Sequence, residues 1–165
     1  MNIFVTDSSP LESARALDDR RLIKMTLETA QLLSGMLWVT QYWDERMYRP
    51  THLKHPCAQW AAADQYNFIW LGQHGRALGS EYMWRFNRAH KSSAVTHTCL
   101  RKIYPSLLEM PLDWFPNLTK FANCSMFKEN PDTIQAYRDT LNVKWQNDKI
   151  KPKWTQGGPP LWCKL

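Results

Sequence analysis

Apolar side chains that recur every three or four residues limit most strongly how this chain can fold. The clearest run lies at 19–41, and its apolar face consists of Leu22, Met25, Thr29, Leu32, Leu33 and Met36. This spacing places the apolar groups on one side of a helix. Similar spacings predict helices at 10–17, 56–90, 94–104 and 131–148. We therefore expect an all-α fold, a compact single-domain helical bundle with long irregular loops and an extended C-terminal tail.

Residues that start helices sharpen two of these boundaries. Ser9, Pro10 and Glu12 have the spacing of a capping box, which begins a helix at Pro10. Asp64 can cap a new helix inside the longest predicted helical stretch. Residues 3–6 are predicted to form either a short strand or an apolar N-terminal plug.

The predicted helical domain comprises residues 1–150, and residues 151–165 form a basic aromatic tail packed on it. The tail contains three prolines and two glycines, so it cannot be a regular helix. The segment 105–130 is interrupted by prolines and is expected to be mostly loop. Small residues in the longest helical stretch would let another backbone approach closely, namely Gly72, Gly75 and Gly79.

Composition excludes several classes of protein. The chain has 165 residues, of which 44% are hydrophobic, so one ordered domain is expected and global disorder is excluded. No apolar run approaches the roughly 20 residues of a membrane span. The first ten residues lack the apolar region of a signal peptide. We therefore expect a cytoplasmic protein that does not enter a membrane.

The charge and the aromatic content favour a particular kind of partner. A net charge of +6 and nine tryptophans suit a polyanion with stackable rings, which means nucleic acid or a nucleotide. Some tryptophans lie at helical spacings and are expected in the core, namely Trp60, Trp70 and Trp145. Aromatic residues in basic irregular segments are the ones that favour nucleic acid, namely Trp43, Tyr48, Trp154 and Trp162.

Cysteines and histidines give no metal motif. The four cysteines are far apart in sequence, so no zinc knuckle or CxxC motif is present, and we expect reduced thiols. They are Cys57, Cys99, Cys124 and Cys163. His52 and His55 have a metal-like spacing but no HExxH motif around them, so polar loop histidines are the simpler interpretation. The sequence predicts no metal and no cofactor.

A second stripe on the 19–41 helix is polar. It consists of Arg21, Lys24, Glu28 and Gln31. Spacings of three and four residues bring one carboxylate together with two cations. One interpretation is a solvated face on which Lys24 and Glu28 form an ion pair worth a few tenths of a kcal/mol. The other is a functional site centred on Glu28.

The segment 42–55 is predicted to be a loop in which aromatic and basic residues interleave, namely Tyr42, Trp43, Arg46, Tyr48, Arg49 and Lys54. This composition suits phosphate contacts combined with base stacking. A loop anchored by its own aromatic side chains explains the pattern equally well. The tail, with Lys153 and Trp154, is either a basic aromatic clamp or a simple wrap over the domain.

Several spacings resemble those of the pyrimidine-dimer DNA glycosylase/AP lyase family of T-even phages, the endonuclease V-like enzymes. Asp19, Leu22 and Glu28 reproduce an early helix of that family that carries its catalytic Glu. A later helix of the family matches Leu71, Leu78, Glu81 and Arg85. The upstream histidine corresponds to His55, and the start of the C-terminal aromatic stretch corresponds to Pro152, Lys153 and Trp154.

The sequence also resembles a group of phage-encoded proteins that begin MNIF. The helix motif that they share matches Lys24, Met25, Glu28, Ala30, Gln31 and Leu33. The glycosylase family uses the α-amino group of the second residue after Met1 is removed, and removal normally requires a small second residue. Here the second residue is Asn2, and Leu27 precedes Glu28 where the family carries arginines. These departures bear on the lyase step more than on the binding of DNA by the rest of the chain.

The resemblance implies a base-excision or base-processing enzyme that acts on damaged or modified double-stranded DNA. The expected catalytic groups are Glu28 and the amine of Met1. Glu28 would stabilise the cationic sugar as the base departs, and a terminal amine would form an imine at C1′. The candidate binding residues are Arg21, Lys24, Gln31, Arg46, Arg49, His52, His55, Arg85, His90, Lys91, Lys153 and Trp154.

Two other functions use the same residues. A non-catalytic phage protein could bind a nucleotide or a modified base in a closed pocket, where Glu28 would recognise a base edge or a ribose. A helical interaction protein could inhibit a host enzyme through exposed aromatic residues. In each case we expect a monomer, in the host cytoplasm if a phage encodes it.

Overall fold

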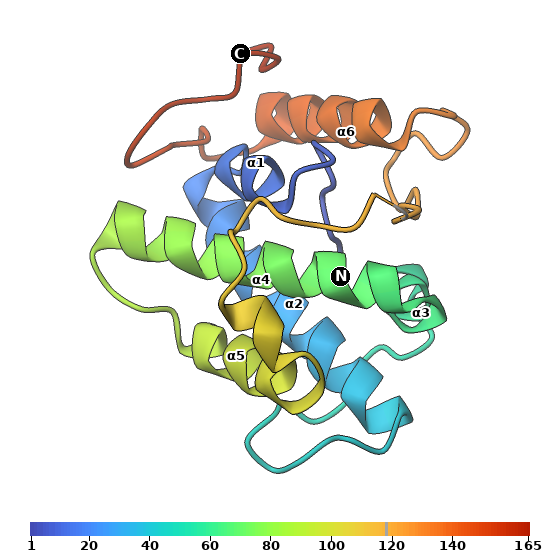
Figure 1. Cartoon of the computed structure of the whole chain (residues 1–165). Coiled ribbons are helices and arrows are strands. Elements are labelled where there is room, and N and C mark those ends of the chain that lie inside the picture. Colours follow the sequence, from blue (N-terminus) through green and yellow to red (C-terminus); the bar gives the residue numbers. More distant parts are fainter. Residues whose placement is uncertain (118) are drawn as a thin grey trace.

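The computed structural model describes residues 1–117 and 119–165, and these residues form helices and loops without a strand. The elements are α1 (Pro10–Arg15), α2 (Asp19–Val39), α3 (Pro56–Ala63), α4 (Gln65–Phe86), α5 (Lys91–Ile103), a 3₁₀ turn η1 (Pro105–Leu108) and α6 (Thr133–Asn147). The prediction of an all-α fold is confirmed. Long irregular segments separate α2 from α3 and η1 from α6 (Figure 1).

The centre of the molecule is α4, which packs against α1, α2, α3 and α5. Glycine permits this close packing. A Cβ atom on Gly75 would lie 2.9 Å from Cγ2 of Thr96 on α5 and 3.1 Å from Cγ2 of Thr29 on α2. The predicted close approach of neighbouring helices therefore occurs along α4. Trp60, Trp70 and Trp145 are buried, as their helical spacing predicted.

Caps explain where the helices begin. The Ser9 hydroxyl accepts a hydrogen bond from the Glu12 N–H at 3.3 Å, which is half of a capping box. The Glu12 carboxylate instead binds Arg15 at 2.8 Å. Asp64 caps α4 by accepting from the Tyr66 N–H at 2.7 Å, so a new helix starts there as expected.

Three predicted boundaries are corrected. The predicted 19–41 helix ends at Val39. The predicted helix to His90 ends at Phe86, because Asn87 adopts a left-handed conformation with φ of 51°. His90 then caps α5 through its ring, so that helix starts at Lys91, three residues before the predicted start.

The N-terminal residues are a plug and not a strand. Ile3 and Val5 are fully buried. The α6 helix packs over this segment, since the Arg138 side chain donates to the Thr6 carbonyl at 2.8 Å and the rings of Phe4 and Tyr137 lie 6.2 Å apart.

The C-terminal tail is bound to the start of α2. The Asp19 N–H donates to the Lys153 carbonyl at 2.8 Å, and the Thr155 hydroxyl donates to the Asp19 carboxylate at 2.6 Å. The ring of Trp154 lies 5.2 Å from that of Trp145 in an edge-to-face arrangement. These contacts wrap the tail over the helical body (Figure 1).

Candidate active site

The site is centred on Glu28, which lies in the middle of α2 with only 9% of its surface exposed. Its Oε2 atom accepts a hydrogen bond of 2.9 Å from the backbone nitrogen of Asn2. Its Oε1 atom lies 3.5 Å from the ammonium of Lys24. The ion pair predicted for a solvated face therefore exists, but its carboxylate is largely removed from water.

The Asn2 side chain holds the N-terminal backbone in position. Its Oδ1 atom accepts from the N–H groups of Ile3 at 2.7 Å and Phe4 at 2.9 Å. Such a local side-chain bond bends the chain in a short turn. Since Ile3 is buried in the core, the turn fixes the backbone nitrogen of Asn2 against Glu28.

A cavity of about 330 Å³ opens beside this contact. It is lined by the N-terminal residues, by one face of α2 and by one side chain of α6. Its cationic side chains are Arg20, Arg21, Lys24 and Lys144. The cavity thus brings the Met1 and Asn2 end of the chain, the Glu28 carboxylate and several positive charges into one place.

The four cations are not equally available to a ligand. Arg21 donates to Asp18 and to Asp148, each at 2.9 Å. Burial opposes its charged form, but these two hydrogen bonds outweigh burial and raise the pKa of Arg21. Two carboxylates therefore compensate its charge. Lys24 and Arg20 have side chains that are 68% and 57% exposed and can reach an anionic partner.

His55 lies close enough to the site to interact with it electrostatically. Its Nδ1 atom caps α3 by accepting from the Cys57 N–H at 3.1 Å. Burial lowers the pKa of His55, and the positive charges of the Met1 amino group and His52 lower it further, while Glu28 acts in the opposite sense. The ring is therefore neutral near pH 7.

Other predicted binding residues lie on the 42–55 loop, outside the Glu28 cavity. Arg46 donates to the Asp44 carboxylate with two nitrogens, at 3.1 and 2.7 Å. Arg49 and His52 are exposed. The Trp43 indole donates to the Tyr48 carbonyl at 2.8 Å, so an aromatic residue anchors this loop.

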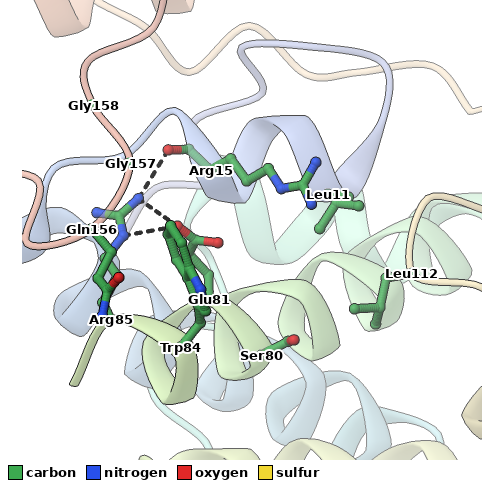
Figure 2. Close-up of a pocket in the computed structure, with 10 residues that line it drawn as sticks. All are labelled: Leu11, Arg15, Ser80, Glu81, Trp84, Arg85, Leu112, Gln156, Gly157 and Gly158. Atoms are coloured by element: carbon green, nitrogen blue, oxygen red, sulfur yellow. Dashed lines mark hydrogen bonds and ion pairs between the residues drawn. The ribbon is translucent and has the colours of Figure 1, made fainter. Parts of the chain in front are cut away.

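Arg85 is committed to internal partners. Figure 2 shows its guanidinium between the carboxylate of Glu81 and the carbonyl oxygen of Arg15. It also donates to the Leu17 carbonyl at 2.7 Å and to Asp19 at 3.1 Å. Only 4% of Arg85 is exposed, and it is one of the residues that line the cavity drawn in Figure 2. Its observed contacts join α4 to the α1–α2 junction.

The remaining predicted residues are placed elsewhere. Gln31 is half-buried one turn beyond Glu28. His90 caps α5 through a 3.2 Å bond from the Ser92 N–H, and Lys91 is exposed beside it. Lys153 and Trp154 lie in the tail, where the Trp154 indole donates to the Ala16 carbonyl at 3.3 Å.

Sequence reasoning missed three residues that line the cavity. Arg20 lies four residues before Lys24, so helical spacing could have identified it. In the sequence, Asn2 draws attention only because it is larger than the second residue that removal of Met1 normally requires. Lys144 reaches the cavity from α6, more than a hundred residues after Glu28 in the chain, and no local sequence pattern predicts such a contact.

Within residues 1–117 and 119–165, no group of three or more His, Cys, Asp or Glu side chains is arranged to hold a metal ion. In the same part of the chain, no helix combines the length and apolar character needed to cross a membrane.

The first part of the chain is similar to a known protein family. The family model described as pyrimidine dimer DNA glycosylase matches residues 1–93. This range includes the N-terminal plug, Glu28, His55 and Arg85, and it excludes α6 and the tail. No curated protein and no solved structure is matched.

Proposed function

The chain belongs to the pyrimidine dimer DNA glycosylase family, and from this premise we propose that it excises damaged bases from double-stranded DNA in the cavity beside Glu28. The observation that carries the proposal is the 2.9 Å contact between the backbone nitrogen of Asn2 and the Glu28 carboxylate. An N-terminal segment, an acid and several cations meet there. This combination suits cleavage of an N-glycosidic bond next to a phosphate backbone.

Glu28 would act electrostatically. As the bond between C1′ and the base breaks, the sugar acquires positive charge. A carboxylate that is held in place and shielded from water stabilises such a charge more strongly than an exposed one does. The Asn2 N–H and Lys24 fix the orientation of the Glu28 carboxylate before the substrate arrives.

An N-terminal amine would be the nucleophile. In a chain that keeps Met1, the amine belongs to Met1, which lines the cavity. In a chain without Met1, the nitrogen that now contacts Glu28 would itself be the α-amine. In either form the neutral amine attacks C1′, and the base leaves with the electrons of the glycosidic bond and one proton of the amine. The C1′–O4′ bond of the sugar then breaks, O4′ takes the second proton of the amine, and an imine joins protein and sugar. Elimination of the 3′ phosphate from the imine then nicks the strand.

Binding of DNA would rely on the cations around the cavity. Arg20, Lys24 and Lys144 line it and would contact phosphates on either side of the damaged nucleotide. Turning that nucleotide out of the duplex costs a few kcal/mol, which the phosphate contacts and stacking would offset. The net charge of +6 favours the encounter.

Borohydride trapping on duplex DNA that contains an abasic site tests the amine mechanism. We expect a covalent protein–DNA adduct, because borohydride reduces an imine to a stable amine. Mass spectrometry of the digested adduct should place the modification on the N-terminal peptide. An adduct on Lys24 would move the nucleophile to a side chain, and the absence of any adduct would exclude imine chemistry.

A further inference from the structure

A second cavity, which we call the Arg76 cavity, lies between α4, α5 and η1. In the fold, α5 and η1 pack against each other and against α4 (Figure 1). The volume is about 570 Å³, and no lining residue is shared with the cavity at Glu28. Its charged and titratable lining groups are Arg76 from α4 and His97 and Arg101 from α5. No Asp or Glu is found among its described lining residues.

Arg76 is held rigidly by neutral acceptors. Its guanidinium donates to the carbonyl oxygens of Leu107, Leu108 and Met110, with distances of 2.9 Å to each of the latter two. It also donates to the Gln73 side chain at 2.6 Å. Within residues 1–117 and 119–165, no carboxylate lies at ion-pair distance from it. The cation is therefore fixed in place but not neutralised, and burial lowers the pKa of Arg76.

The two basic side chains that α5 contributes to this cavity are His97 and Arg101. Burial lowers the pKa of His97, and the charges of Arg76 and Arg101 lower it further. All three groups are thus close enough to interact. A neutral imidazole can still donate one N–H to an anion. Arg101 is exposed, and the described part of the chain offers it no carboxylate at ion-pair distance.

Small residues bring the two helices of the cavity close together. The α4 wall beside Arg76 contains Gly75 and Gly79. A Cβ atom on Gly79 would lie 2.7 Å from the Ser93 hydroxyl, so any side chain there would push into α5. The glycines therefore permit the close approach of α4 and α5 that places Arg76, His97 and Arg101 around one cavity.

We propose that the Arg76 cavity is an anion site that binds a phosphate group through Arg76, His97 and Arg101. Two guanidinium groups and an imidazole around one cavity can donate to the oxygens of a phosphate, and the lack of a carboxylate among the described lining residues favours an anionic ligand. The phosphate is either part of a DNA backbone or a free phosphate ester. The proposal is independent of base excision, because the site contains none of the groups assigned to that reaction.

The test compares two neighbouring substitutions in the full chain. Arg101→Ala removes a cation of the cavity. Lys102→Ala removes the same charge from the next residue, whose ammonium lies 3.8 Å from Asp44 and does not line the cavity. Each protein is titrated with inorganic phosphate, with thymidine 5′-monophosphate and with a short undamaged DNA duplex at several salt concentrations. Thermal unfolding verifies that both variants are folded.

We expect Arg101→Ala, and not Lys102→Ala, to weaken one of these interactions by about tenfold, the scale of one charge-assisted hydrogen bond. If the phosphate comes from DNA, duplex affinity falls and the slope of log affinity against log salt decreases by about one. If it is a free ester, saturable binding of the monophosphate is lost and duplex affinity is unchanged. Equal behaviour of the two variants in every titration would overturn the proposal.

His97 gives a second readout in the unmodified protein. Its ring resonances in an NMR spectrum should move as the ligand identified above is added, while those of the fully buried His74 should not. A ligand that binds without moving the His97 resonances binds elsewhere and would also overturn the assignment.

Discussion

At the scale of single residues, the surroundings of Glu28 differ from those that its sequence neighbours suggest. Glu28 lies on a helix face that looks solvated in sequence, because Lys24 and Gln31 flank it at helical spacings. In the structure the N-terminal segment covers this face and leaves Glu28 only 9% exposed. An acid that is shielded from water and contacted by a backbone N–H is suited to electrostatic catalysis.

Glu28→Gln is expected to abolish base excision while duplex binding stays within a factor of a few. The amide keeps the shape but loses the charge that would stabilise the cationic sugar, and removal of one such group typically costs a factor of at least about 100 in rate. Single-turnover excision assays and fluorescence anisotropy measure the two properties. Glu12→Gln is the matched control, since Glu12 is an exposed acid paired with Arg15. Excision that survives in Glu28→Gln would remove Glu28 from the mechanism.

At the scale of helices, Arg85 connects the elements that shape the site. It fixes the C-terminal half of α4 to the carbonyl groups of Arg15 and Leu17, just before α2 begins. The helix that carries Glu28 therefore starts from a position set by a buried guanidinium. The contacts of Arg85 thus hold helices together.

Arg85→Ala should destabilise the fold by about 3–5 kcal/mol, because Glu81 and Asp19 would remain buried without their shared cation. Chemical denaturation followed by circular dichroism measures this change. Arg88→Ala on the following loop, where the guanidinium lies 5.9 Å from the Tyr82 ring, should change stability much less. Equal stabilities of the two variants would contradict the structural role of Arg85.

Local sequence signals predict the positions of helices, but they do not predict contacts between residues far apart in the chain. Apolar spacing and the residues at Ser9 and Asp64 were sufficient to place α1, α2 and α4, since these signals are local. The predicted end of α4 is wrong because the spacing of apolar residues does not show that Asn87 adopts a left-handed conformation. Helical spacing was enough to predict the contact between Lys24 and Glu28, whereas the position of Lys144 at the cavity depends on how α6 packs, which no local rule predicts.

At the scale of the whole molecule, stability is linked to pH through a buried histidine. His74 is fully buried, its Nδ1 lies 3.0 Å from the Pro10 carbonyl, and its ring stacks on Trp70 at 4.9 Å. Burial lowers the pKa of His74 to about 4. The folded protein therefore keeps this ring neutral under conditions in which the unfolded chain protonates it.

The free energy of unfolding should consequently fall as the pH drops from about 6.5 toward 4. Over that interval the unfolded state protonates the His74 ring, whereas the native state keeps it neutral. The lowered pKa of His74 corresponds to a loss of about 3 kcal/mol in the free energy of unfolding. Urea titrations at several pH values measure how the free energy of unfolding depends on pH. This dependence should be weaker in His74→Gln, and an unchanged dependence in that variant would assign the acid sensitivity to other groups.

The cavity at Glu28 is assembled from the first residues of the chain, from α2 and from Lys144 near the end of the last helix. A ribosome releases these parts in that order. The plug and the acid therefore leave the exit tunnel long before the cation that completes the cavity. On a growing chain the cavity therefore stays unfinished until α6 has docked.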